Sequence, residues 1–209
     1  MRSPFRILMG ALALVALGAA VRADEKKPVG GTKPAGAPLE LTITGTATYE
    51  LDLGGQTSEA YAKAIAAAAE KGGRMPAPPK VELKLTVKNT SDKAITIHRN
   101  GDTVVLELEL KGKGAVGAAP NLAFTTDFRL PTEVELGAGK SIEFALTALT
   151  GGFRGASKFA YWTAPGDYEL IASWKTGVSP APKGSDANDG FGTVTVTGAP
   201  FKIAVTEKK

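Results

Sequence analysis

The chain has 209 residues, of which 43% are hydrophobic and 22% charged, and its mean hydropathy is close to zero. This composition is typical of an ordinary globular protein with one domain or two small ones. The sequence contains no cysteine and one histidine. It therefore excludes a disulfide scaffold, a thiolate metal site and a thiol nucleophile, and it leaves little room for histidine chemistry.

Residues 1–23 have the pattern of a secretory signal peptide. Arg2 and Arg6 precede an apolar run from residue 7 to residue 21, and Val21 and Ala23 are small residues at the positions that signal peptidase reads. The run is shorter than the roughly 20 residues that a spanning helix needs, so we expect no transmembrane span. The alternatives are a cut after Ala20 and an uncleaved N-terminal anchor.

Residues 24–38 follow with lysine, glycine and proline and almost nothing apolar, which predicts a flexible linker. We therefore expect an exported protein that is periplasmic or extracellular after cleavage of the signal peptide. Without Arg2, Arg6 and Arg22, 22 Lys and Arg face 21 Asp and Glu. This balance is too neutral for a nucleic-acid-binding protein.

Residues 39–209 carry the pattern of a single β-rich domain. Residues 39–53 alternate strictly between apolar and polar, and Gly45 in the middle suggests a bend at which the strand passes from one sheet to another. The exception is an alanine-rich helix predicted over about 58–72, with Ser58 as N-cap and Gly72 as its end. Short strands then follow to the C-terminus, and Asn100-Gly101 predicts a hairpin between 94–98 and 103–110. The fold class is therefore all-β: an antiparallel two-sheet sandwich with one short capping helix.

Three segments resemble bacterial immunoglobulin-like domains. Residues 83–97 are similar to the paired B and C strands of that family, and residues 136–141 resemble the turn that opens an E-like strand. Residues 164–170 resemble the entry to strand F, where Tyr168 would close the corner between the sheets and Leu170 stands in place of the second cysteine. The resemblance covers roughly residues 81–206 and implies an immunoglobulin-like sandwich. The combination of a signal peptide, a tether and such a sandwich also resembles the organisation of exported bacterial proteins.

The segment from residue 153 to residue 162 is the candidate ligand-binding site. Phe159, Tyr161 and Trp162 lie there with interleaved basic residues, so they would form an exposed platform for sugar rings or a peptide, or else cover the open end of the core. The platform interpretation predicts a secreted, non-enzymatic binding or structural module whose partner is a protein or polysaccharide of the cell envelope or extracellular space.

Two alternatives come from other functional classes. The first is a protease inhibitor of the bacterial immunoglobulin-like type, which would present the loop 112–121 to an active-site cleft. The second is a hydrolase that uses a pair of carboxylates, because the spacing of Asp and Glu along strands does not predict their separation in space. His98 at a strand end is more typical of a surface histidine than of a catalytic one, and the sequence predicts no catalytic residue.

The loop 184–190 is the candidate metal site. Asp186, Asn188 and Asp189 offer side-chain oxygens that suit calcium, although the spacing departs from that of an EF-hand. The competing interpretation is a turn rich in Asp and Asn before a strand. We expect no cofactor, unless this loop binds calcium. The glycines at positions 112, 114 and 117 match a dinucleotide-binding spacing, but Pro120 prevents the helix that this motif needs, which favours a hairpin loop.

Overall fold

The computed structural model describes residues 37–119 and 127–208. The predicted signal peptide and residues 24–36 of the predicted linker lie outside this range. Ala37 is buried, and the Pro38 carbonyl accepts a hydrogen bond from the Thr90 amide at 2.7 Å, so the last two residues assigned to the linker are part of the fold. No helix in the described part of the chain is both long enough and apolar enough to cross a membrane.

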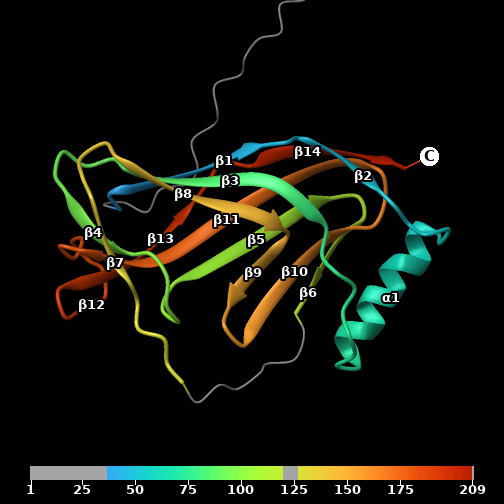
Figure 1. The fold of residues 1–209 in the computed structure, drawn as a ribbon, viewed down its shortest axis with the longest axis horizontal. Coiled ribbons are helices and arrows are strands. Elements are labelled where there is room, and N and C mark those ends of the chain that lie inside the picture. Colours follow the sequence, from blue (N-terminus) through green and yellow to red (C-terminus); the bar gives the residue numbers. More distant parts are fainter. Residues whose placement is uncertain (1–36, 120–126, 209) are drawn as a thin grey trace, which may run out of the picture.

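Two packed β-sheets and one helix make up the described structure (Figure 1). The smaller sheet is antiparallel and has the order β1 (Leu39–Gly45), β3 (Lys80–Asn89) and β8 (Ser141–Ala148). The larger sheet runs in the order β12 (Ala187–Asn188), β13 (Phe191–Thr197), β11 (Gly166–Ser179), β5 (Val105–Gly112), β9 (Thr150–Phe153), β10 (Ala156–Trp162) and β6 (Ala115–Ala118). Four further strands attach to it beside this path: β2 (Thr48–Leu51), β4 (Ile95–His98), β7 (Glu133–Leu136) and β14 (Phe201–Glu207).

The long strand β11 organises the larger sheet. β14 pairs with residues 166–170 and β13 with residues 173–178 along one edge of β11. β5 pairs with residues 168–175 along the other edge, and β4 pairs with residues 178–179 beyond it. Alternate residues of β11 are buried, because a strand turns successive side chains to opposite faces. One face of β11 therefore packs on the core and the other is open to solvent.

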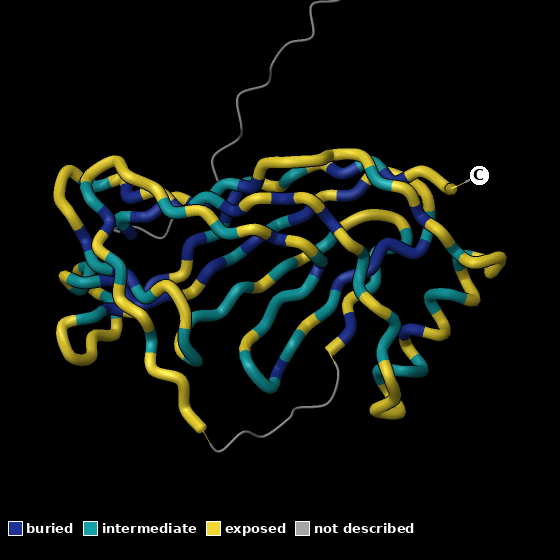
Figure 2. Tube along the Cα trace, in the orientation of Figure 1, coloured by how far each residue is buried: buried dark blue, intermediate teal, exposed yellow. Residues whose placement is uncertain are grey.

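Two strands pass from one sheet to the other. The first strand continues from β1 in the smaller sheet to β2 in the larger sheet, with a break at Gly45, whose φ of 131° is a glycine conformation. This confirms the predicted bend. The strand β8 likewise continues through the fully buried Leu149 into β9. These crossings join the sheets covalently around one apolar core, and Figure 2 shows that core as the buried positions between them.

The helix α1 (Ser58–Glu70) covers a strand pair rather than the end of the main core. Its N-cap is Thr57, one residue before the predicted Ser58, and the Thr57 hydroxyl accepts a hydrogen bond from the Ala60 amide at 3.2 Å. The predicted stop at Gly72 is confirmed by a φ of 64°. Ile65 is the buried residue of the helix, and it packs with Tyr161 of β10 and Ala118 of β6. The mostly alanine stripe thus forms a small cluster outside the main core.

The hairpin predicted at Asn100-Gly101 is wrong. β4 pairs with β7 and β11, and β5 pairs with β11 and β9, so the strands on either side of this turn do not pair with each other. Instead, the Asn100 side chain accepts a hydrogen bond from the Thr132 amide at 3.0 Å, and the Gly101 backbone lies against Pro131. The turn is therefore held by the segment that leads into β7. The sequence also predicts a strand over residues 122–128, of which residues 122–126 lie outside the described part of the chain.

The buried side-chain amide of Asn89 connects two turns at one end of the sandwich. Its Nδ2 donates hydrogen bonds to the carbonyls of Lys93 at 2.7 Å and Leu136 at 2.9 Å, and its Oδ1 accepts one from the Ser91 amide at 2.9 Å. These bonds tie the turn after β3 to the turn between β7 and β8. Removal of the amide leaves buried backbone groups without partners, which is a costly change.

We expect Asn89→Ala to lower the free energy of unfolding by about 2 to 3 kcal/mol. Urea denaturation of the variant and of the wild-type protein measures this difference. The exposed Asn188→Ala is the matched control and should change stability by less than about 0.5 kcal/mol. Equal stability of the two variants would contradict the role assigned to Asn89.

Candidate functional site

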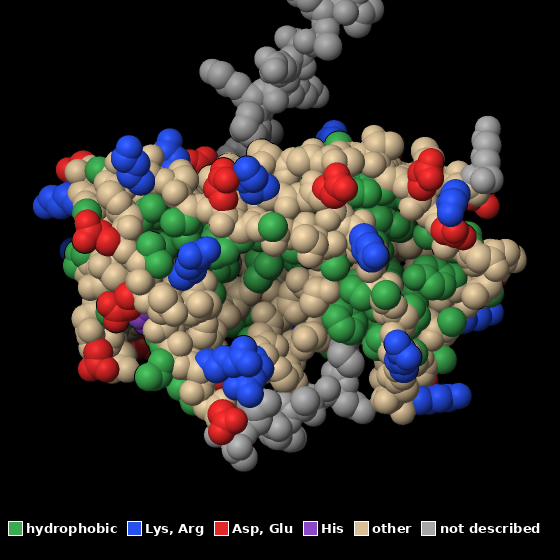
Figure 3. Space-filling view, viewed as in Figure 1, with side chains coloured by type: hydrophobic (Ala, Val, Ile, Leu, Met, Phe, Trp, Pro, Cys, Tyr) green, Lys and Arg blue, Asp and Glu red, His purple; other side chains and the backbone are tan. Residues whose placement is uncertain are grey.

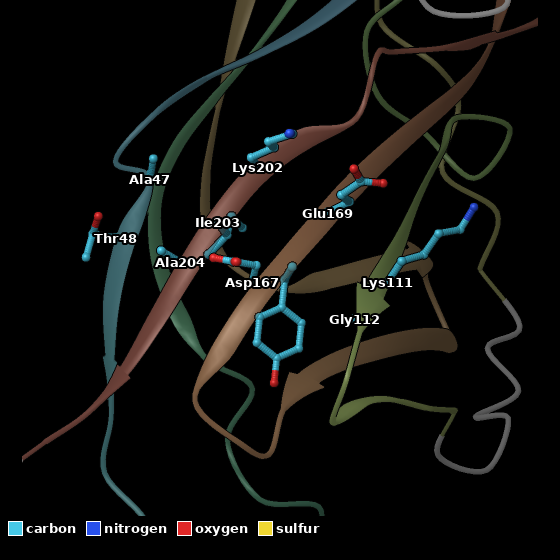
Figure 4. Close-up of a pocket in the computed structure, with 10 residues that line it drawn as sticks. Ala47, Thr48, Lys111, Gly112, Asp167, Glu169, Lys202, Ile203 and Ala204 are labelled. Carbon is cyan, nitrogen blue, oxygen red and sulfur yellow. The ribbon is translucent and has the colours of Figure 1, made fainter. Parts of the chain in front are cut away.

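A broad concavity lies on the solvent face of the larger sheet, where β2, β14, β11 and the end of β5 run side by side (Figure 4). We call it the charged groove. It has a volume of about 610 Å³ and is lined by ten residues: Ala47, Thr48, Lys111, Gly112, Asp167, Tyr168, Glu169, Lys202, Ile203 and Ala204.

The charges of the groove follow from strand register. Glu169 of β11 is paired with Lys202 of β14 on one side and with Lys111 of β5 on the other. Directly paired residues of antiparallel strands point to the same face, so the three side chains form a row of positive, negative and positive charge. Neighbouring strands lie about 4.8 Å apart, which puts the two lysine positions about 10 Å apart.

The next row of the groove is small and polar. Asp167 is paired with Ala204, and Ala204 is paired with Thr48 of β2. The small side chains of Ala204 and Thr48 leave the sheet surface low beside Asp167. Both carboxylates, Asp167 and Glu169, are exposed, and Lys111 also lies 3.5 Å from Glu109 along its own strand. The groove therefore offers charged and hydrogen-bonding groups in contact with water.

Under the groove, an aromatic cluster forms a rigid floor. The ring of Trp162 stacks on Tyr49 with centroids 5.3 Å apart and lies against Tyr168 at 6.4 Å. The Tyr168 hydroxyl shares its one proton between two acceptors, the Ala164 carbonyl at 2.6 Å and the Lys113 carbonyl at 2.9 Å. Burial raises the pKa of the Tyr168 hydroxyl, which keeps it a donor at neutral pH.

Gly112 is required where the groove meets this floor. Its φ of 146° is a conformation that suits glycine, and a Cβ built there would lie 2.7 Å from both the Tyr168 ring and the Asp167 carbonyl. Thr163 donates hydrogen bonds from its amide and its hydroxyl to the Gly114 carbonyl, both at 2.9 Å. The glycine-rich segment is thus the tight turn between β5 and β6. These two strands pair with other strands and not with each other, so the predicted hairpin loop is wrong although the turn is present.

The predicted binding platform is not exposed, so that interpretation is corrected. Tyr161 is 0% exposed and Trp162 is 3% exposed. As consecutive residues of β10 they point to opposite faces: Trp162 into the main core and Tyr161 toward α1. Both faces of this strand are covered, which explains why a run of aromatic residues is buried. The other predicted interpretation, in which these rings cover the core, is closer to the structure.

Tyr161 and Phe159 belong to the cluster under the helix. The Tyr161 hydroxyl donates to the Pro76 carbonyl at 2.8 Å, and burial beside Tyr61 raises its pKa to about 12. Phe159 meets the Tyr161 ring edge to face at a centroid distance of 6.4 Å. Phe159 is half-buried, and it also lines a recess of about 430 Å³ between β5, β6 and β10. It is the one member of the predicted platform that keeps access to a surface recess.

The candidate calcium loop forms a β-hairpin. Asp189 and Gly190 have φ values of 50° and 81° and occupy the corner between β12 and β13, which is the preferred use of an Asp-Gly pair. Asp186, Asn188 and Asp189 are all exposed. Among the described residues, no group of three or more Asp, Glu, His or Cys side chains is arranged to hold a metal. The competing prediction of a turn before a strand is confirmed.

His98 lies outside the groove and takes part in packing. Its ring is 4.2 Å from that of Phe191 and covers Gly177, where a Cβ would lie 2.6 Å from the imidazole Nδ1. The His98 carbonyl accepts a hydrogen bond from the buried Thr176 hydroxyl at 2.6 Å. These contacts give His98 a structural role where β4 meets β11.

Because Trp162 fills the main core, we expect Trp162→Ala to lower the free energy of unfolding by about 3 to 5 kcal/mol. Thermal and urea denaturation measure the loss. The control is Phe153→Ala, which removes an exposed ring from the tip between β9 and β10 and should cost far less. A Trp162→Ala protein as stable as the Phe153→Ala protein would contradict the burial of this side chain.

Comparison with known protein families finds no family model that matches this chain, and comparison with curated proteins finds no matching sequence. No sequence motif identifies the charged groove, because its charged residues come from three separate strands. Function must therefore be inferred from the geometry of these side chains and from the pattern of the sequence.

Proposed function

We propose that this protein is an exported, non-enzymatic binding module that uses the charged groove to contact a protein or polysaccharide of the cell envelope or extracellular space. Export is supported by the pattern of residues 1–23 and by the polar tether that follows them. The single observation that carries the binding function is the row of charges in the groove. A surface of this kind suits a polar ligand that carries charges or hydroxyl groups of its own.

An immunoglobulin-like sandwich is the architecture we propose for this module. Tyr168 lies at the start of a central strand, and its hydroxyl bonds to a carbonyl four residues upstream. This arrangement is typical of the tyrosine corner of immunoglobulin-like folds. Two packed sheets that exchange strands, as β1 and β2 do, support the same assignment.

Binding is favoured over hydrolysis by the surroundings of the two carboxylates. A glycosidase-type pair needs one carboxyl group kept protonated by a pocket that excludes water. Asp167 and Glu169 are the pair that such an enzyme would use, and both are exposed beside lysines. They are better suited to hold a charged ligand than to transfer a proton.

The protease-inhibitor alternative is disfavoured, because most of the loop that it needs lies in a strand or in a turn held by hydrogen bonds. Of the residues 112–121 proposed to enter a protease cleft, Ala115–Ala118 is the strand β6, paired with β10. The turn before β6 is fastened to Tyr168 and Thr163. An inhibitory loop must stand free of the scaffold to fill a cleft, whereas residues 115–118 are part of the sheet and residues 120 and 121 lie outside the described part of the chain.

We expect Lys111→Glu with Lys202→Glu to weaken ligand binding by at least about tenfold, because the two changes reverse both positive ends of the row. The measurement is retention of labelled protein on a defined array of peptides and cell-envelope polysaccharides, followed by titration of each ligand that is retained.

The matched control is Lys84→Glu with Lys88→Glu on the outer face of the smaller sheet, which changes the net charge equally. It should bind as the wild-type protein does. The proposal is wrong if the array retains nothing, or if both double variants bind every retained ligand equally.

A further inference from the structure

The large hydrophobic side chains that stand exposed in the described part of the chain lie on two neighbouring segments. They are Phe128, Leu130 and Phe153, with 62%, 79% and 47% of their surface accessible. Single exposed apolar residues are ordinary on protein surfaces, but a group of large ones marks an interaction surface. We call this group, with its neighbouring arginines Arg129 and Arg154, the apolar tip.

Two separate segments form the apolar tip. Phe153 ends β9 at the turn into β10, whereas Phe128 and Leu130 belong to the extended segment that leads into β7 (Figure 1). The Arg154 guanidinium joins the two segments, because its Nη1 donates a hydrogen bond to the Asp127 carbonyl at 2.9 Å. Hydrophobic side chains and Lys or Arg side chains lie together along the lower edge of the molecule in Figure 3.

The segment that carries Phe128 and Leu130 is held in position. The Asp102 carboxylate accepts a hydrogen bond from the Arg129 amide at 3.0 Å, and the Asp102 amide donates one to the Arg129 carbonyl at 3.1 Å. The Asn100 side chain fixes the Thr132 amide in the same way. The two rings and the leucine are therefore presented to solvent by an ordered backbone, which lowers the entropic cost of binding.

The arginines of the apolar tip are placed to meet an anionic partner, although two carboxylates balance their formal charge. In each segment an arginine directly follows an exposed phenylalanine: Arg129 follows Phe128, and Arg154 follows Phe153. Between the segments lies a recess of about 380 Å³, lined by both arginines and by Ser157 and Asn100. Two carboxylates are close by, of which that of Asp102 already bonds to the backbone and that of Asp127 is exposed.

We propose that the apolar tip binds the surface of an anionic lipid bilayer. The phenylalanines and Leu130 enter the boundary between headgroups and acyl chains, and the guanidiniums meet lipid phosphates beside or within the recess. Exposed phenylalanines that are each followed by an arginine, as Phe128 and Phe153 are, match the layered polarity of a bilayer surface, where apolar and anionic layers are adjacent. The apolar tip shares no residue with the charged groove, so this inference does not rest on the proposed function.

Vesicle binding of the chain from Asp24 to Lys209 tests the proposal. This chain keeps every described residue and omits the apolar run of residues 7–21, which would bind lipid by itself. We expect it to sediment with phosphatidylcholine vesicles that contain about 30% phosphatidylglycerol, and to bind pure phosphatidylcholine far more weakly. Binding should weaken when the salt concentration is raised from about 0.1 M to about 0.5 M, because salt screens the arginines.

Two sets of variants separate the apolar and the charged contributions. The triple variant Phe128→Ser, Leu130→Ser, Phe153→Ser should bind anionic vesicles at least about tenfold more weakly. Arg129→Gln and Arg154→Gln should each weaken binding to anionic vesicles about fivefold. Arg154→Lys keeps the charge, so it should weaken vesicle binding less than Arg154→Gln does. Because the apolar side chains are exposed, the triple variant should unfold at the wild-type temperature.

The control Lys111→Gln with Lys202→Gln removes two positive charges from the charged groove and should leave vesicle binding unchanged. Absence of binding to anionic vesicles would overturn the proposal. So would a triple variant that binds as the wild-type protein does, or a loss of binding caused equally by the groove control. Self-association of the protein that the triple variant abolishes, without vesicle binding, would assign the apolar tip to a second copy of the chain instead.

Discussion

The hydroxyl of Tyr168 is the contact on which both the larger sheet and its groove depend. It joins the turn before β11, through Ala164, to the turn between β5 and β6, through Lys113. β11 pairs with four strands, two along each edge, so the point at which it begins sets the register of all of them. The ring of Tyr168 is buried against Trp162, which fixes the hydroxyl in place.

This contact also explains why a groove forms at this position. Residues on either side of the buried Tyr168, Asp167 and Glu169, must point to the opposite face of β11 and therefore carry their charges into solvent. Gly112 has no side chain, so the Tyr168 ring can lie directly against the end of β5. The result is an apolar, tightly packed floor beneath a charged and hydrated surface. The apolar tip reverses this arrangement, because there the rings are exposed and the backbone beneath them is fixed by polar contacts.

Local signals in the sequence predicted the parts of the fold that depend on neighbouring residues. Period-two alternation located the first strand and its bend at Gly45, and the Asp and Asn residues of the loop 184–190 located a turn before a strand. The hairpin expected at Asn100-Gly101 failed because both adjacent strands find distant partners. The strand β10 was interpreted as a surface platform because burial on both faces removes the alternation that marks a strand. The groove could not be predicted, since the row of Lys111, Glu169 and Lys202 exists only through the pairing of three strands.

Hydrogen–deuterium exchange of Tyr168→Phe tests the central role of this hydroxyl most directly. The substitution keeps the ring in the core and removes only the donor to the carbonyls of Lys113 and Ala164. The account predicts faster exchange at the amides of residues 112–114 and 163–169, a loss of about 1 to 3 kcal/mol in stability, and unchanged exchange between β1 and β3. Exchange that stays at the wild-type rate in the two turns, or that rises equally throughout both sheets, would contradict it.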